Sequence, residues 1–227
     1  MKFEELGLSQ PLLKAIEDKG YTEPSEVQKK SIPLLLDGKD VLAQSQTGTG
    51  KTAAFGLPLL SKLETYNGKD IKGLILCPTR ELAIQVSQEL KDYGKYMPNI
   101  KVATIFGGQP INVQIKDIRR GANIIVATPG RLLDHINRKT IKLKSCDYLV
   151  LDEADEMLNM GFVDDIREIF EYLPEENQMA FFSATMPKEI VQLSNDFLED
   201  PKRISLSRNN LTVSRIEQVY YMIDQNQ

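Results

Sequence analysis

Cysteine and histidine are scarce in this 227-residue chain, which contains two cysteines and one histidine. Cys77 and Cys146 each border an apolar run and lack C-x-x-C spacing. We therefore interpret them as small buried side chains of a protein in a reducing compartment. The single His135 has no nearby metal ligands or catalytic partner in the sequence, so a structural role is predicted for it.

Long apolar runs and an excess of positive charge are also missing. No stretch reaches the roughly eighteen apolar residues that span a bilayer, and the first ten residues lack an apolar signal core. We expect a cytoplasmic protein without membrane contact. The net charge of −4 argues against a broadly basic surface, so any nucleic-acid site must be local. The 41% of hydrophobic residues is ordinary for a globular chain, and the length fits one α/β domain.

Short apolar runs recur along the chain and predict strands. They are "DVLAQ" near residue 40, "GLILCPT" from 73, "KVATIFGG" from 101, "NIIVATPG" from 123, "DYLVLDE" from 147 and "MAFFSAT" from 179. Apolar residues at helical spacing lie between them, as in Leu82, Val86 and Leu90. Continuous apolarity predicts strands covered on both faces. We expect an α/β fold, a doubly wound and mostly parallel sheet with helices on both faces, which binds ligands at the carboxyl ends of its strands.

The two ends of the chain differ from this repeat. Residues 1–38 predict a helical segment packed on the core, with one helix from Ser9 to Gly20 and a second from Ser25 toward Gly38. Pro33 predicts a kink in the second helix. Residues 39–207 would form the main domain. Residues 208–227 are interpreted as the start of a linker to an absent second domain.

Residues 43–52, "AQSQTGTGKT", resemble a phosphate-binding loop. Gly48 and Gly50 would let backbone N–H groups approach phosphate oxygens at the start of a helix. Lys51 could reach the terminal phosphates, and the Thr52 hydroxyl could bind Mg²⁺. The usual loop has glycine at position 45, where this chain has Ser45. The motif alone could also be a surface turn.

A second acidic motif strengthens the nucleotide hypothesis. "YLVLDEAD" places Asp152 and Glu153 at the tip of a predicted buried strand, where one carboxylate could hold Mg²⁺ and the other polarise an attacking water. In isolation the motif could be an acidic helix cap. Together with the loop it indicates a hydrolase of magnesium-bound nucleoside triphosphates.

The order of these motifs resembles the N-terminal RecA-like domain of DEAD-box ATP-dependent RNA helicases, over nearly the whole chain, and a bacterial member is expected. The matching segments are Phe3 with "GYTEPSEVQ" (20–28), "SQTGTGKT" (45–52), "PTREL" (78–82), Gly107 with Gly108, "TPGR" (128–131), "DEAD" (152–155) and "SAT" (183–185). In this family the loop is A-x-T-G-x-G-K-T, so Ser45 replaces an alanine and not a required glycine.

The resemblance implies an ATP site that also uses Mg²⁺. The helical preface would be the Q motif, in which Gln28 reads adenine and Phe3 and Tyr21 pack near the base, although both aromatics could equally be core residues. The phosphate loop would comprise Ser45, Gln46, Thr47, Gly48, Thr49, Gly50, Lys51 and Thr52. Thr52 and Asp152 would hold the metal, and Glu153 would be the catalytic base beside Lys51 and Asp152. Asp155 would bond Ser183 and Thr185, linking the ATP site to RNA.

The resemblance also implies contacts to an RNA backbone without base reading. They would come from Pro78, Thr79, Arg80, Gly107, Gly108, Thr128, Pro129, Gly130 and Arg131, at strand ends that open helices. Taken alone, "TPGR" could be an ordinary turn. Sequence-nonspecific single strands and short duplexes are the expected partners, with 2′-hydroxyl contacts selecting RNA over DNA.

The family's second RecA-like domain supplies arginines to the γ-phosphate, and no such motif follows residue 185. We expect the chain by itself to hydrolyse ATP poorly and to unwind nothing. For the parent protein three alternatives stay open: an RNA helicase, an ATP-gated RNA clamp with incidental hydrolysis, and a DNA helicase or repair ATPase of the same superfamily. Gln28 with "PTREL" disfavours the third.

Overall fold

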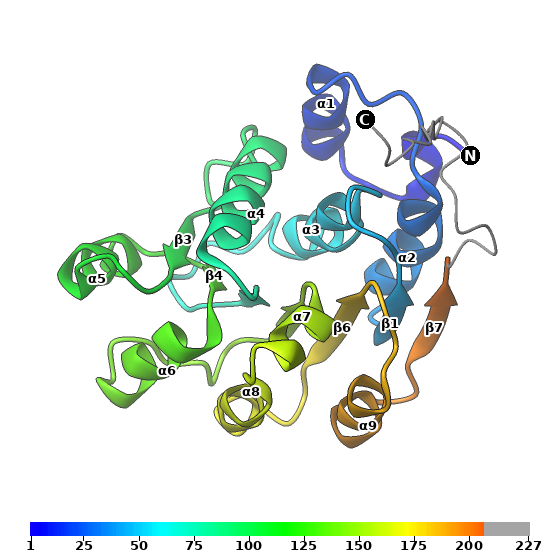
Figure 1. Cartoon of the computed structure of the whole chain (residues 1–227). Helices are drawn as coiled ribbons and strands as arrows, with labels where there is room; N and C mark the ends of the chain where they lie inside the picture. The colour runs from blue at the N-terminus through cyan, green and yellow to red at the C-terminus, as the bar shows by residue number, and fades with distance from the viewer. Residues whose placement is uncertain (207–227) are drawn as a thin grey trace, which may run out of the picture.

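The computed structural model describes residues 1–206, which form a seven-stranded sheet with helices on both faces (Figure 1). Every neighbouring pair of strands is parallel, in the order β3-β4-β2-β5-β6-β1-β7. The strands are β1 (Val41–Gln44), β2 (Gly73–Leu76), β3 (Val102–Ile105), β4 (Ile124–Ala127), β5 (Tyr148–Leu151), β6 (Gln178–Ser183) and β7 (Lys202–Ser205). The six predicted strands and the doubly wound α/β class are confirmed, while β7 was not predicted.

Nine α-helices and one short 3-10 helix surround this sheet within residues 1–206. They are η1 (Phe3–Leu6), α1 (Gln10–Asp18), α2 (Glu26–Leu36), α3 (Lys51–Lys62), α4 (Arg80–Tyr93), α5 (Ile111–Arg119), α6 (Pro129–Asn137), α7 (Ala154–Asn159), α8 (Val163–Phe170) and α9 (Lys188–Phe197). None of the helices in this part of the chain is long and apolar enough to cross a membrane.

Alternate residues of each central strand face two separate hydrophobic cores. In β5, Tyr148 and Val150 join the core beneath α1 to α4, whereas Leu149 and Leu151 join the core over α6 to α9. All four side chains are buried. This two-sided burial explains why the sequence of the strand is continuously apolar.

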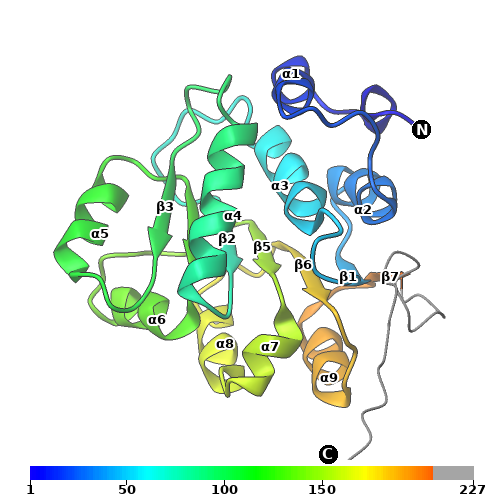
Figure 2. The same ribbon diagram turned by 45° about the horizontal axis from the view of Figure 1, so that its top comes forward.

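The helical preface lies against the first of these cores. Leu12 and Ile16 of α1 and Val27 and Ile32 of α2 are almost fully buried there. Figure 2 shows α1 and α2 beside α3. The helices begin after Ser9 and Ser25, as predicted. Residues 208–227, the predicted linker, lie outside the described residues, and the predicted division into domains stays a prediction.

A buried carboxylate at the amino end of β1 fixes the order of the last strands. Asp40 accepts hydrogen bonds from the backbone N–H groups of Met179 (2.8 Å) and Glu199 (2.7 Å). Burial raises the pKa of Asp40, although both hydrogen bonds oppose that rise. This carboxylate joins the start of β6 and the turn before β7 to the start of β1.

Candidate nucleotide and nucleic-acid site

The phosphate loop runs from the carboxyl end of β1 into α3, and two glycines give it a left-handed backbone. Gly48 and Gly50 have φ of 78° and 88°, a region that side chains other than glycine rarely adopt. Ser45 is buried, its hydroxyl lies 2.6 Å from the Thr49 hydroxyl, and its N–H donates to the Ser183 carbonyl at 2.9 Å. The serine therefore fits the close-packed start of the loop and bonds within it.

Eight of the predicted nucleotide residues line one cavity of about 210 Å³, whereas Phe3, Gln28, Ser45, Gln46 and Thr49 do not line it. Its walls include Lys51, Thr52, Asp152 and Glu153, together with Tyr21 and the loop residues Thr47, Gly48 and Gly50. The opposite wall is formed by side chains of α4, which sequence reasoning missed: Leu82, Gln85, Glu89 and Tyr93. The volume is below the roughly 300–1,000 Å³ of typical ligand pockets.

Lys51 and Asp152 line that cavity, and each carries a buried polar atom that is unsatisfied in the described part of the chain. Both residues are almost fully buried, and neither Lys51 Nζ nor Asp152 Oδ1 has a hydrogen-bond partner within residues 1–206. Burial raises the pKa of Asp152 to about 6, while the positive charge of Lys51 lowers it. A buried cation and a buried carboxylate with free positions are costly unless a ligand completes them. The pair fits a phosphate bound by the lysine and a metal bound by the acid.

Glu153 turns the chain sharply from β5 into α7. Its φ of 54° and ψ of 52° lie in the left-handed region, which is strained for a glutamate. Its carboxylate accepts a hydrogen bond of 3.4 Å from the Thr47 hydroxyl of the phosphate loop. The strained turn therefore holds Glu153 against the loop, beside Asp152 and on the same cavity.

Gln28 bonds the phosphate loop itself. Its Oε1 accepts from the Ser25 N–H and its Nε2 donates to the Gly50 carbonyl, both at 3.0 Å. One amide hydrogen of Gln28 remains for a base. Phe3 is 4% exposed and belongs to the core, whereas Tyr21 is 40% exposed. Both aromatics also border a hollow of about 610 Å³ on the helical preface, and Tyr21 alone borders the phosphate cavity as well.

The predicted contact between the acidic motif and "SAT" is present. Asp155 Oδ2 accepts hydrogen bonds from the backbone N–H and the hydroxyl of Thr185, both at 2.8 Å. The Asp155 N–H donates to the Ser183 hydroxyl at 3.2 Å. Burial acts to raise the pKa of Asp155, but the hydrogen bonds from Thr185 and Ser183 hold it below its usual value. The start of α7 is thereby bonded to the end of β6.

The predicted RNA-binding segments lie side by side at the carboxyl ends of β2, β4 and β3, which are neighbours in the sheet. Thr79 caps α4 by accepting from the Leu82 N–H at 3.2 Å, and Pro129 begins α6. Arg80 is exposed, and its guanidinium lies over the Phe106 ring at 5.2 Å, next to Gly107 and Gly108. Helix starts and an arginine therefore share one edge, as expected for backbone contacts.

A buried polar network supports this edge from below. Arg131 Nη1 donates to the Gln109 carbonyl (2.9 Å) and to Gln114 Oε1 (3.2 Å). Gln114 Nε2 in turn donates to the Phe106 carbonyl at 2.8 Å, and its Oε1 lies 3.0 Å from His135 Nε2. Burial lowers the pKa of His135. His135 thus has the structural role predicted, whereas nothing in the spacing of α5 pointed to Gln114.

The two cysteines are buried and unpaired, in agreement with the sequence interpretation. Burial raises the pKa of both thiols, that of Cys146 to about 12. They are inert under ordinary conditions. Among the described residues no group of three or more histidine, cysteine or acidic side chains has the arrangement of a metal site formed by protein ligands alone.

Comparisons with known proteins agree with this geometry. Residues 25–193 match the family described as DEAD/DEAH box helicase. The DEAD-box ATP-dependent RNA helicase CshA of Bacillus cereus (strain ATCC 10987 / NRS 248) is 48% identical over 223 residues, which are 98% of this chain and 42% of that protein. The ATP-dependent RNA helicase CshA of Limosilactobacillus reuteri is 50% identical over 220 residues, 97% of this chain and 44% of that protein. The chain thus spans less than half the length of these relatives.

Solved structures give the same result. A DEAD box protein from the hyperthermophile Methanococcus jannaschii has a TM-score of 0.85 at 45% identity, and the match covers 91% of this chain and 56% of that one. A hypothetical ATP-dependent RNA helicase from Sulfolobus tokodaii has a TM-score of 0.81 at 41% identity, over 87% of this chain and 57% of that one.

Proposed function

This chain belongs to the DEAD/DEAH box helicase family, and we propose that it is the ATP-binding and RNA-binding half of an ATP-dependent RNA helicase. The observation that carries the proposal is a cavity lined by a buried lysine and a buried aspartate, whose Nζ and Oδ1 atoms have no hydrogen-bond partner within residues 1–206. A magnesium-bound triphosphate would supply the missing partner of each. ATP rather than GTP would be selected by the free amide positions of Gln28.

The residues around the cavity would have different roles in phosphoryl transfer. Lys51 would bind the terminal phosphates, and backbone N–H groups of the loop would bind the phosphate next to it. Thr52 and Asp152 would hold Mg²⁺, which when bound neutralises charge on the phosphates. Glu153, held against the loop by its strained turn, would orient the attacking water and accept its proton.

The RNA strand would cross the carboxyl ends of β2, β4 and β3. Arg80 and the N–H groups at the starts of α4 and α6 would contact phosphate oxygens, while Arg131 would hold the Gly107–Gly108 turn in place through Gln109. The Asp155 contacts to Ser183 and Thr185 would couple the two sites. With a second RecA-like domain, ATP binding would close the site on RNA and bend short duplexes apart.

The test compares the 227-residue chain with the full-length protein in an RNA-stimulated ATPase assay and an ATP-dependent strand-displacement assay. The full-length protein is expected to do both. The chain alone is expected to be slower by roughly 10³-fold or more, because no arginine from a second domain reaches the γ-phosphate. Robust ATP hydrolysis by the chain alone would contradict the proposal that a second domain completes the catalytic site.

The same assay with Glu153→Gln separates a helicase from an ATP-gated RNA clamp. A helicase loses displacement in the Glu153→Gln variant while RNA retention in ATP stays. Equal RNA retention and no displacement by either form would assign the protein as a clamp. Stimulation of hydrolysis by DNA as strong as that by RNA would instead favour a DNA-acting member of the superfamily.

A further inference from the structure

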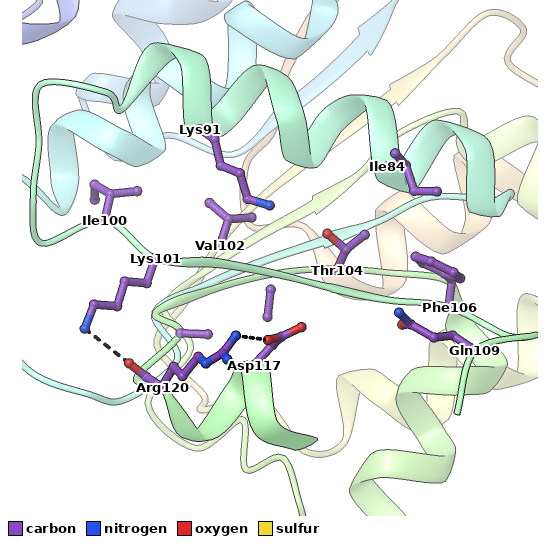
Figure 3. A pocket seen from close by; sticks show the side chains of 12 residues that line it. Ile84, Lys91, Ile100, Lys101, Val102, Thr104, Phe106, Gln109, Asp117 and Arg120 are labelled. Atoms are coloured by element: carbon purple, nitrogen blue, oxygen red, sulfur yellow. Dashed lines mark hydrogen bonds and ion pairs between the residues drawn. The ribbon is translucent and has the colours of Figure 1, made fainter. Parts of the chain in front are cut away.

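A groove of about 660 Å³ runs along the free edge of the sheet, away from the nucleotide cavity (Figure 3). Its floor is β3, the last strand in the sheet order, and its two walls are α4 and α5. Ile84 and Lys91 project from α4, two helical turns apart and so on one face. Asp117 of α5 and Arg120, which follows the end of that helix, lie on the other side. Figure 2 shows β3 between these two helices at the edge of the molecule.

The backbone of β3 presents unused hydrogen-bonding groups to this groove. The Lys101 carbonyl accepts from the Ile124 N–H (3.1 Å) and the Ile105 carbonyl from the Thr128 N–H (2.9 Å), so these two residues face β4. In a parallel strand alternate residues bond opposite neighbours. The N–H and C=O groups of Val102 and Thr104 therefore point outward, and no strand lies on that side within residues 1–206.

The charge of the groove is opposite to that of the chain. Three cationic residues line it, Lys91, Lys101 and Arg120, with one acid, Asp117. That acid is already paired with Arg120 at 2.7 Å, so two lysine charges are in excess in a chain with a net charge of −4. Apolar surface is present as well, because Ile84 is 43% exposed and Val102 is partly exposed.

From these features we infer that the groove is a docking site for an extended acidic peptide of a partner protein, which adds to the sheet as an eighth strand beside β3. The outward N–H and C=O groups of Val102 and Thr104 need both acceptors and donors, and another extended peptide backbone supplies both. RNA phosphates accept but cannot donate, whereas a peptide backbone supplies acceptors for the Val102 and Thr104 N–H groups and donors for their carbonyls at the same spacing. Acidic side chains would meet Lys91 and Lys101, and apolar ones would cover Ile84.

The proposed docking site uses none of the ATP-binding residues, so its test is independent of the test of the proposed function. The probe is a fluorescein-labelled octapeptide of alternating aspartate and valine, titrated with the 227-residue chain and followed by fluorescence anisotropy. Saturable binding at low salt is expected, with amide chemical shifts that move most at Val102 and Thr104. An octapeptide of alternating lysine and valine, or one methylated at every second amide, should bind at least about tenfold more weakly.

Two variants test the charge and the backbone separately. Lys91→Glu with Lys101→Glu should weaken binding of the acidic peptide by about tenfold or more. Val102→Pro removes one outward N–H at the first position of an edge strand, where proline is tolerated, and should weaken binding by about fivefold. Lys188→Glu, an exposed lysine at the start of α9 that does not line the groove, reverses one charge, half the change of the double variant, and should stay within about twofold. Thermal unfolding checks that each variant is folded.

Three results would overturn the inference. The first is the absence of saturable binding by the wild-type chain. The second is wild-type affinity in both the charge variant and folded Val102→Pro. The third is displacement of the peptide by a single-stranded oligouridine whose own binding falls in the charge variant, because that result would assign the groove to RNA.

Discussion

Lys51 begins α3 after β1, Asp152 follows β5, and both line the same cavity, where Lys51 Nζ and Asp152 Oδ1 each lack a hydrogen-bond partner in the described part of the chain. The positive charge of Lys51 lowers the pKa of Asp152, so the two groups influence each other. The proposed function puts the magnesium-bound triphosphate beside this pair, and most of the predictions below depend on it.

Replacing Lys51 should separate ligand binding from folding. Lys51→Met removes the cation that would contact the terminal phosphates, so affinity for ATP should fall by about tenfold to a hundredfold. The ligand-free protein should keep or gain thermal stability, because a buried charge without a partner is removed. Calorimetric titration and thermal unfolding measure the two effects. Lys62→Met, near the surface at the end of the same helix, should leave ATP affinity unchanged.

The raised pKa of Asp152 predicts opposite effects of pH on stability and on metal binding. The pKa of Asp152 is about 6 in the folded chain, against a reference value of 3.8 that applies to the unfolded chain. Between these two pH values the folded state therefore keeps a proton that the unfolded state has released. The stabilisation from this proton is fully present below about pH 4 and is lost as pH rises through about 6. Affinity for magnesium-bound nucleotide should instead decline as pH falls through 6, since metal binding needs the carboxylate.

Asp152→Asn is the matched test of that linkage. The variant should show a flatter dependence of unfolding free energy on pH between 4 and 7, and its nucleotide affinity should no longer depend on Mg²⁺. Urea unfolding at several pH values measures the first effect. An unchanged pH profile would show that Asp152 is not the group that titrates.

The double hydrogen bond of Gln28 predicts a structural as well as a recognition role. Gln28→Leu would leave the Ser25 N–H and the Gly50 carbonyl without their partner, which should cost about 1–3 kcal/mol of unfolding free energy. Discrimination of ATP over GTP should also decrease. Gln88→Leu, an exposed glutamine on α4, should change the unfolding free energy by less than about 0.5 kcal/mol. Selectivity lost at full stability would contradict the double role.

Arg80 and Arg131 should differ in how they affect RNA binding. Arg80 is exposed and lies over Phe106, so Arg80→Ala should lower RNA affinity without changing stability. The slope of log affinity against log salt concentration should become less steep by about one. Arg131→Ala should lower RNA affinity and also stability, because it breaks the bonds to Gln109 and Gln114. Arg138→Ala, exposed at the end of α6, serves as the control. Salt titrations of oligouridine binding give the slopes.

The Asp155 contacts predict a variant that binds ATP but responds poorly to RNA. Thr185→Val keeps the shape of the side chain and removes only the hydroxyl bond to Asp155. In the full-length protein, affinity for ATP should stay within about twofold, while stimulation of hydrolysis by RNA should fall several-fold, since a hydrogen bond to a charged group contributes about 1.5–3 kcal/mol. Full stimulation in the variant would show that this contact does not couple the sites.

Which parts of the fold could be predicted depends on how local their signals are. The strands of the sheet centre, such as β5, are buried on both faces and so are continuously apolar over residues 148–151. The edge strand β7 has the sequence "KRIS", in which only Ile204 is buried, so no apolar run marks it. Its place is set by backbone pairing with β1 and by Asp40, whose partners Met179 and Glu199 are far away in the sequence.

The candidate nucleotide site shows the same difference between residues with a local sequence signal and residues placed by long-range packing. Lys51, Thr52, Asp152 and Glu153 belong to short motifs whose chemistry depends on immediate neighbours, and the parallel sheet brings their strand ends together. The α4 wall of the cavity and the bond from Gln28 to Gly50 arise from the packing of separate helices, which spacing along one helix does not encode. Gln114 is similar, because its partners belong to two other segments, the residue Phe106 after β3 and the helix α6.

The most direct test of the central claim replaces Mg²⁺ with paramagnetic Mn²⁺ in the complex of the 227-residue chain with ATP. Amide signals of Lys51, Thr52, Asp152 and Glu153 should all broaden together, and Mn²⁺ without nucleotide should broaden them much less. Broadening at the phosphate loop but not at Asp152 and Glu153, or no broadening at either at saturating ATP, would contradict a shared site for the lysine and the acids.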